Sequence, residues 1–308
     1  MEQELEGLIA DQAGMLARRQ LLAHGIQWER VRNQIAAGRW VERTPRVIST
    51  TTGTLDGEQW LWLAVLHAGP RSMLANLSAA ARHGLTGWER PDVIVMVDDE
   101  LSFDPVLGVD FFRSRRPFST LLSPKPGIPS CRLEPAVLLW AGYEATNRAA
   151  HGIIAATLQQ RLTTGPRMVD WVERLRPLRR AKPFKRTISF AEGGAHSGAE
   201  LEVGRMCRQF GLPQPQRQVR RTDRNGRQRW TDAEWVLPDG TTLVLEVDGG
   251  YHLDIVQAGD DAKRSRRITT RTRVVVRCTA YELAHEAGEV ASDLVALGLP
   301  GRVPDAAA

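Results

Sequence analysis

The sequence predicts a multidomain α/β protein in which an N-terminal winged helix-turn-helix precedes two α/β regions. Three observations favour this class. Residues 1–55 read as two helices and an extended wing, helix-like and strand-like runs alternate after them, and 308 residues are enough for two or three domains. We expect a winged helix-turn-helix at 1–55, a mixed α/β middle domain with a basic linker at 56–180, and an α/β/α domain at 190–308.

The composition argues against a membrane protein and indicates a polyanionic partner. Hydrophobic residues make up 42% and charged residues 25%, which is ordinary for a soluble globular protein. No run of 18 apolar residues occurs and the first residues lack an apolar signal-peptide core, so we expect a cytoplasmic protein. The net charge of +5 and the pI of about 9.5 favour nucleic acid as the partner.

The three cysteines predict structural roles. Cys131, Cys207 and Cys278 lie far apart and form no C-x-x-C pair. This spacing argues against a disulfide framework or a zinc finger, and free cysteine is usually a small buried hydrophobic residue.

The first 55 residues have the outline of a DNA-binding module. The pattern predicts a helix reaching about Ala23, a turn with Gly25, and a second helix from about Gln27 to Ala36. Gly38 ends this second helix, and residues 40–49 read as a β-wing. The second helix would present four side chains that read base edges or hold phosphates: Arg30, Arg32, Asn33 and Gln34. A small helical subdomain with a solvated polar face is the alternative, and the same outline also serves protein contacts.

The middle region reads as mixed α/β without a chemical motif. The runs "EQWLWLAVLHAG" and "CRLEPAVLLWAG" predict helices, and "PDVIVMVDD" and "VDFFRSR" predict strands. Between them, "RSMLANLSAAARHGL" predicts a short strand followed by a helix. His67 and His83 stand among apolar residues without a ligand partner at a suitable spacing, which favours a packing role over a metal role.

After a helical stretch at 151–180, the run "VERLRPLRRAKPFKR" predicts a domain boundary and a solvated basic linker. The next helix shows apolar residues at i, i+3, i+4 and i+7, from Val203 to Phe210, and Gly211 ends it. A basic run at 217–229, a hairpin, the charged helix "DIVQAGDDAKRSRRITT", the strand "RVVVRCT" and a final helix follow.

The hairpin "RWTDAEWVLPDGTTLVLEVDGGYH" carries an unusual number of carboxylates for a strand pair. In its turn, Pro238 suits the second position of a type I turn and Gly240 suits a positive φ, so we expect a three-residue loop that pairs Leu237 with Thr241. This register sets Asp232 opposite Glu246. A two-residue loop would instead turn Asp232 to the other face.

Side-chain alternation then places three carboxylates on one face of the sheet: Asp232, Glu246 and Asp248. Leu243, Leu245 and Val247 point to the other face. Carboxylates this close repel one another unless a hard divalent cation such as Mg²⁺ or Mn²⁺ lies between them, and such an ion activates water against a phosphodiester. His252 follows a glycine pair and suits a general base or acid.

The string "LEVDGGYH" with the preceding Asp232 resembles the active-site core of the restriction-endonuclease-like PD-(D/E)XK superfamily, and within it the branch related to very-short-patch-repair endonucleases. The N-terminal region resembles the winged-helix domain of AbiEi-type antitoxins. The two resemblances cover residues 10–50 and 197–290. They imply a restriction-endonuclease-like α/β/α fold at the C-terminus, DNA as substrate, and a toxin or another protein as a further partner.

Carried over by position, Asp232 and Glu246 match the metal-binding carboxylates of the superfamily. Asp248 stands where the superfamily often has lysine. Three explanations remain open: Asp248 is a ligand with His252 as proton acceptor, Lys263 substitutes for the missing lysine, or the site is inactive. The alternative for the whole cluster is a solvated sheet face with Glu246 paired to an arginine. Glu200, with Glu202 second, matches an acidic residue on the first helix, although Ser197 and Glu200 also fit a helix capping box.

The function expected is hydrolysis of DNA phosphodiester bonds, in which Arg264, Arg267 and the basic run hold the backbone. A non-catalytic, antitoxin-like DNA-binding regulator with a degenerate nuclease fold is the alternative, and RNA processing is a third reading. The nucleotide-binding patterns G-x-x-x-x-G-K-[ST] and G-x-G-x-x-G are missing, which argues against energy-driven translocation.

Overall fold

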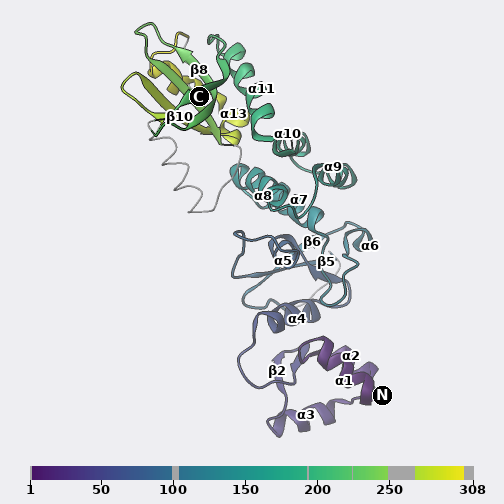
Figure 1. Ribbon diagram of the computed structural model, residues 1–308. Coiled ribbons are helices and arrows are strands. Elements are labelled where there is room, and N and C mark those ends of the chain that lie inside the picture. Colours follow the sequence, from purple (N-terminus) through teal and green to yellow (C-terminus); the bar gives the residue numbers. More distant parts are fainter. Residues whose placement is uncertain (1, 99–103, 193, 224, 249–267, 302–308) are drawn as a thin grey trace. The chain divides into compact units, whose positions relative to one another are not determined.

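The computed structural model describes residues 2–98, 104–192, 194–223, 225–248 and 268–301, and over these ranges the protein is mixed α/β with three sheets (Figure 1). The chain divides into two compact units, Met1–Trp140 and Ala141–Ala308. Among the described residues, no helix is both long enough and apolar enough to cross a membrane.

The first unit begins with a small helical region closed by a three-stranded sheet. Its elements, in chain order, are α1 (Glu2–Asp11), β1 (Met15–Ala17), α2 (Arg18–Ala23), α3 (Trp28–Ala36), β2 (Val41–Thr44) and β3 (Val47–Ser49). The sheet has the order β1-β3-β2 and is antiparallel throughout. A buried cluster that includes Leu21, Val31 and Ile48 holds the helices against it. The second predicted helix is thus present as α3, and the extended segment predicted at 40–49 forms strands β2 and β3.

The single helix predicted to reach Ala23 is wrong. The chain leaves α1 through Ala13 and Gly14, which have φ of 51° and 82°, and then forms strand β1 before α2 begins. Met15, Leu16 and Ala17 have good helix propensity, yet all three are fully buried and pair with β3. Pairing and burial therefore outweigh local propensity at this point.

The rest of the first unit contains a second small sheet with helices around it. The elements are α4 (Gly57–Ala68), β4 (Ser72–Leu74), α5 (Asn76–Arg82), β5 (Val93–Asp98), β6 (Val109–Ser114), α6 (Phe118–Leu121) and the start of α7 (Leu133–Tyr143). Strand β5 is central, antiparallel to β4 and parallel to β6. His67 is fully buried, with its ring nitrogens 2.9 Å from Thr44 Oγ1 and 2.8 Å from the Asp104 carbonyl, which fits the packing role expected for it.

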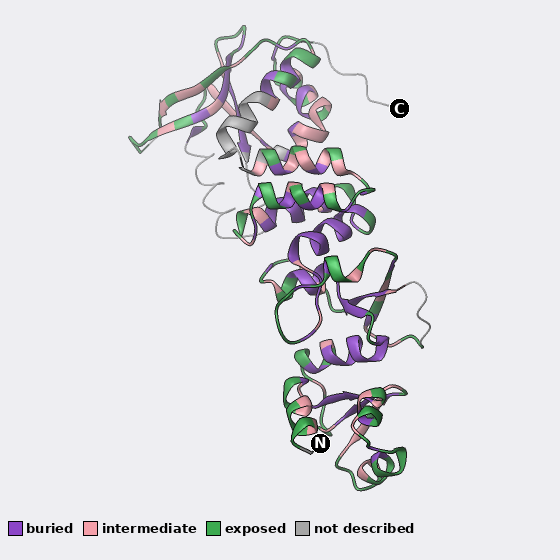
Figure 2. Ribbon diagram, turned by 90° about the vertical axis from the view of Figure 1, so that its right-hand side faces the viewer, coloured by how far each residue is buried: buried purple, intermediate pink, exposed green. Residues whose placement is uncertain are grey.

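Three helices open the second unit: α8 (Asn147–Gln159), α9 (Gly165–Arg174) and α10 (Ala181–Glu192). Helix α8 is buried continuously from Ala150 to Thr157. Figure 2 shows several such buried helical stretches in purple. The basic segment predicted to be a solvated linker, 172–186, runs through the end of α9 and the start of α10 instead. Its apolar members explain the difference, since Val172 and Phe184 are fully buried.

A four-stranded mixed sheet dominates the remainder of the second unit. The sheet and the helices next to it consist, in chain order, of α11 (Gly194–Gln209), β7 (Gln216–Thr222), β8 (Gln228–Val236), β9 (Thr242–Asp248), β10 (Arg273–Thr279), α13 (Ala280–His285) and α14 (Ala287–Ala296). The strand order is β10-β9-β8-β7, in which β10 is parallel to β9 and the other neighbours are antiparallel.

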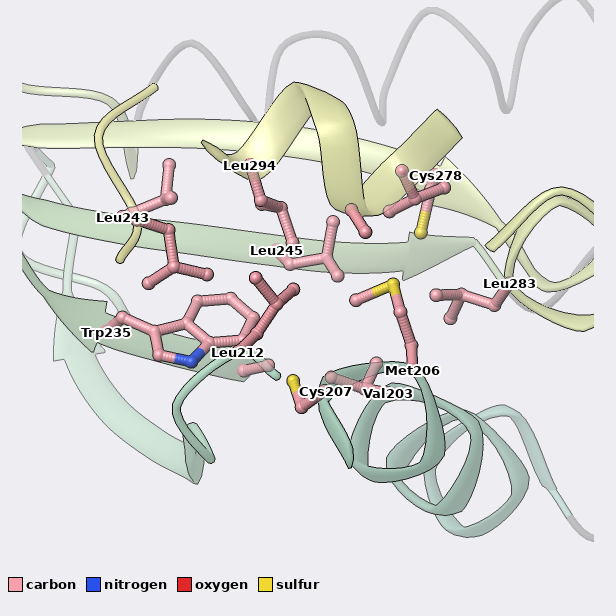
Figure 3. Packing of buried hydrophobic residues seen from close by; sticks show 14 of the residues in the cluster. Val203, Met206, Cys207, Leu212, Trp235, Leu243, Leu245, Cys278, Leu283 and Leu294 are labelled. Carbon is pink, nitrogen blue, oxygen red and sulfur yellow. The ribbon is translucent and has the colours of Figure 1, made fainter. Parts of the chain in front are cut away.

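Helices α11, α13 and α14 cover one face of this sheet (Figure 3). Met206 and Cys207 on α11 point toward Leu245 and Trp235 of the sheet, as the apolar spacing of that helix predicts. Cys207 and Cys278 belong to this core and Cys131 is buried in the first unit, so all three cysteines have the structural environment expected of them. Burial raises the pKa of Cys207 to about 11, which keeps its thiol protonated.

Candidate functional site

The β8–β9 hairpin has the loop that its sequence predicts. The Leu237 N–H donates to the Thr241 carbonyl at 2.8 Å, the Gly240 N–H donates to the Leu237 carbonyl at 2.9 Å, and Gly240 has a φ of 83°. Ala233 lies opposite Leu245 along the ladder. The ladder ends at this pair, so the predicted pairing of Asp232 with Glu246 is not part of it.

The two faces of β9 differ as the alternation of its side chains predicts. Leu243, Leu245 and Val247 belong to the core under the helices. Val244 and Glu246 alternate with them and therefore project from the other face, which we call the acidic face. Glu246 is only 4% exposed there, so its carboxylate is largely withdrawn from solvent.

Asp232 lies where β8 and β9 separate. The last ladder pair on this side joins Ala233 to Leu245. Beyond this pair, the Val247 N–H donates a hydrogen bond of 2.9 Å to Asp232 Oδ2. In a regular antiparallel ladder a backbone carbonyl of β8 would accept this hydrogen bond, and here a side-chain carboxylate accepts it instead. This bond holds the Asp232 carboxylate beside the backbone N–H of Val247, the residue that follows Glu246.

An arginine of the neighbouring strand stands at the register position of Glu246. Along the parallel ladder of β9 and β10, Arg277 is the register partner of Glu246, and Arg273 is the partner of Thr242. A buried carboxylate needs a compensating positive charge, and Arg277 is close enough in the sheet to contribute one. Arg273 and Arg277 stand at the two ends of the run "RVVVR" and share a face of the sheet by alternation. This spacing is the sequence signal for arginine on that face.

Glu234, the fourth carboxylate on the two strands of the hairpin, has a structural role. It is 2% exposed and accepts hydrogen bonds from Arg221 of β7. Arg221 Nη2 donates to Glu234 Oε2 at 2.7 Å, and Arg221 Nε lies 3.1 Å from Oε2 and 3.2 Å from Oε1. Thr231 Oγ1 donates to the same carboxylate at 2.8 Å. The hydrogen bond to Glu234 raises the pKa of Arg221, so the guanidinium stays charged. Glu234 is thus occupied by protein donors.

The basic run forms strand β7 and its turn into β8. Asp223, the one acid within it, accepts the Asn225 and Arg227 N–H groups through Oδ1 and Arg229 Nε through Oδ2. Burial favours the neutral carboxyl, but these donors prevail and hold the pKa of Asp223 below its usual value. Arg217 and Arg220 are exposed on the strand itself. The strand next to β8 thus presents positive charge to solvent.

Several predicted residues lie outside what the structure describes. His252, Arg264 and Arg267, together with Lys263, fall within 249–267. Asp248 ends β9 and Glu200 lies within α11, but the structure describes neither side chain. Helix α11 begins at Gly194, so Ser197 is inside the helix and is not its N-cap. Within the described ranges, no group of three His, Cys, Asp or Glu residues is placed to hold a metal ion.

Helix α3 presents most of the predicted nucleic-acid contacts. Arg30, Arg32 and Asn33 are exposed, whereas Val31 between them is buried and fixes the helix to the core. Gln34 is half-buried, and its Oε1 accepts a hydrogen bond of 2.6 Å from Arg39 Nε. Near the start of the helix the ring of Trp28, 45% exposed, lies 3.9 Å from the Arg18 guanidinium carbon. This surface combines arginines with an exposed aromatic ring.

No family model matches this chain, and neither does any curated protein with which it was compared.

Proposed function

We propose that this protein is a divalent-metal-dependent endonuclease that hydrolyses DNA phosphodiester bonds. The observation that carries the proposal is the position of Asp232, whose carboxylate is bonded to Val247 beside Glu246 where the sheet opens. A helix followed by three antiparallel strands and a fourth, parallel strand agrees with the restriction-endonuclease-like core that the sequence resembles. A match of topology alone would leave the function open, so the placement of the acids is the stronger support.

The residues present fit a hard divalent cation such as Mg²⁺ or Mn²⁺. Asp232 and Glu246 would hold it through carboxylate oxygens, and Asp248, two residues after Glu246, is the predicted third ligand. When bound, the ion would neutralise charge on the phosphodiester and make a water molecule more acidic. The burial of Glu246 fits this role, because a withdrawn carboxylate attracts a cation strongly.

The chain's own residues would orient and bind the substrate. The Val247 N–H fixes the rotamer of Asp232, so this ligand is in place before substrate arrives. Arg220 on the neighbouring strand is exposed and suited to a phosphate of the DNA backbone, whereas the Arg217 guanidinium lies against Gly204 of α11 on the helical side of the sheet. His252 remains the predicted proton acceptor, and Arg264 and Arg267 remain predicted backbone contacts.

The N-terminal region would bring the nuclease to DNA. The order α1-β1-α2-α3-β2-β3 with a three-stranded sheet supports the winged helix-turn-helix assignment. In that module the second helix of the pair enters the major groove, and here α3 would present Arg32 and Asn33 to it. Arg30 and Gln34 belong to the same predicted contact set.

The alternative function is a non-catalytic DNA-binding regulator, and the position of Arg277 favours it. A guanidinium at the register position of Glu246 would balance its buried charge without a metal ion. In that case the C-terminal unit would act as a scaffold, and a toxin or another protein would be its partner. The two functions share the DNA-binding surface but differ in metal uptake and cleavage.

The test compares cleavage of supercoiled, linear, mismatched and single-stranded DNA, and of RNA, in Mg²⁺, Mn²⁺ or EDTA. Asp232→Asn and Glu246→Gln should each lower the cleavage rate by roughly a hundredfold or more while leaving DNA affinity unchanged. Asp170→Asn makes the same acid-to-amide change on exposed α9 and should cleave normally. Cleavage that survives both site substitutions would refute the assignment. A wild-type chain that binds DNA but neither takes up Mn²⁺ nor cleaves would establish the regulator instead.

A further inference from the structure

A pocket of about 310 Å³ opens among the helices of the second unit, between α10, α11, α13 and the start of α14. Helix α11 packs on the face of the sheet opposite Glu246, so this pocket belongs to the helical side and not to the acidic face. Its volume is at the lower end of the range that small-ligand sites occupy.

One end of the pocket carries two arginines that a single acid holds in place. Glu202 Oε1 lies 2.7 Å from Arg205 Nη1 and 3.6 Å from Arg186 Nη2. The Glu202 side chain is 16% exposed, whereas the two arginine side chains are 50% and 57% exposed. Each guanidinium has five N–H donors, so Glu202 orients both groups and leaves most of their donors for a ligand. This end therefore has a surplus of one positive charge.

His285 and the start of α14 also line the pocket. The His285 ring packs on the ring of His151 with their centroids 4.1 Å apart, and His151 is fully buried and bonded to Thr187 Oγ1 at 2.6 Å. Ala287 and Gly288, the first two residues of α14, line the pocket, and no side chain caps that helix. Backbone N–H groups at a helix start favour an anion.

The other end of the pocket is apolar with one amide. Met206, Phe210 and Leu283 line it, and Gln209 adds a group that both donates and accepts hydrogen bonds. With a rise of about 1.5 Å per residue, α11 carries Gln209 roughly 10 Å from Glu202. This separation is comparable to the distance from the phosphate of a mononucleotide to the far edge of its base.

We propose that this pocket binds a nucleotide that carries a terminal phosphate. The phosphate lies at Arg186, Arg205 and the start of α14, and the base lies on Phe210 within reach of Gln209. The shared chemistry is a phosphate monoester next to a base, carried either by a free nucleotide or by the 5′ end of a DNA strand. This site is independent of the proposed nuclease site and holds whether or not the chain cleaves DNA.

Isothermal titration calorimetry of the full chain tests the proposal, in EDTA so that metal-dependent binding does not contribute. AMP should bind at least tenfold more tightly than adenosine or inorganic phosphate, because neither of these fills both ends of the pocket. A short single-stranded oligonucleotide with a 5′-phosphate, compared with its 5′-hydroxyl counterpart, distinguishes the two sources. Preference for the phosphorylated strand over AMP identifies a DNA end, and the reverse identifies a free nucleotide.

Arg205→Gln and, separately, Arg186→Gln should weaken AMP binding by about tenfold, because each removes a charged hydrogen-bond donor to the phosphate. Arg208→Gln makes the same change on the same helix outside the pocket and should alter affinity less than twofold. Circular dichroism would verify that each variant is folded. Adenosine binding as tight as AMP binding, equal loss in Arg205→Gln and Arg208→Gln, or no AMP binding at millimolar concentration would overturn the proposal.

Discussion

The carboxylate of Asp232 accepts the backbone N–H of Val247 at 2.9 Å, where β8 leaves β9. This bond replaces a regular rung of the sheet with a side chain. It places an acidic group in the gap between strands, next to Glu246, and removes the rotamer freedom that a metal ligand would otherwise lose on binding. The candidate metal site is therefore built into the pairing of the strands.

Substitution of Glu234 should destabilise the second unit without a direct effect on chemistry. Glu234→Gln replaces the charged carboxylate that Arg221 and Thr231 share with a neutral amide that has one acceptor oxygen, and we expect a loss of about 2–3 kcal/mol in the free energy of unfolding. The loss should be below that of a fully buried pair, because the Arg221 side chain is 33% exposed. Urea denaturation followed by circular dichroism measures it.

The matched control for that change is Asp170→Asn, which breaks an exposed pair with Arg174 and should cost less than about 1 kcal/mol. Equal losses in the two variants would show that Arg221 and Glu234 contribute no more than a surface pair.

Stability should fall in mildly acidic solution because of His151. Burial, with the nearby His285, Arg180 and Arg186, lowers the pKa of His151 to about 4. The ring is neutral in the fold but takes up a proton in the unfolded chain below its ordinary pKa of about 6.5. The contribution of the neutral His151 ring to the free energy of unfolding is therefore fully present above pH 6.5. It is lost as the pH falls toward 4, by roughly 3 kcal/mol in total.

His151→Gln removes this titration, so its free energy of unfolding should fall less between pH 7 and pH 4.5 than that of the wild type. His24→Gln, on the first unit, is the control and should follow the wild-type profile. A variant profile parallel to the wild type at every pH would contradict the role given to His151.

DNA binding by α3 should depend on Arg32. Arg32→Gln removes an exposed cation, and we expect weaker binding together with a smaller salt dependence, by about one unit in the slope of log K against log salt. Fluorescence anisotropy over a series of salt concentrations measures both quantities. Arg174→Gln, which removes an exposed arginine from α9, should change neither. An unchanged slope in Arg32→Gln would remove α3 from the interface.

The three-residue hairpin loop should be sensitive at Gly240. Its φ of 83° lies in the left-handed region, where an L residue with a Cβ costs about 1–2 kcal/mol. Gly240→Ala should lower the free energy of unfolding by that amount even though nothing lies within 4 Å of the added methyl group. Gly53→Ala is the control, since Gly53 has an equally open surrounding and no positive φ. Indistinguishable unfolding curves for the two variants would contradict the conformational argument.

The sequence by itself determined those features that depend on a few neighbouring residues. The Pro238-Asp239-Gly240 turn sets the hairpin register, and that register sets which side of β9 its leucines and Glu246 face. The spacing of Val203, Met206 and Cys207 likewise sets the buried face of α11. Turn type and side-chain period act over short distances, so they are readable from the chain alone.

Only the tertiary structure decided the features that depend on partners distant in sequence. Met15–Ala17 becomes a strand because β3 pairs with it, and the basic segment around Phe184 becomes helical because a core receives its apolar side chains. The ion pair of Arg221 with Glu234 and the register pairing of Arg277 with Glu246 depend on how separate strands align. Alignment of strands joined by long connections is set by packing over the whole unit, and no short stretch of sequence encodes it.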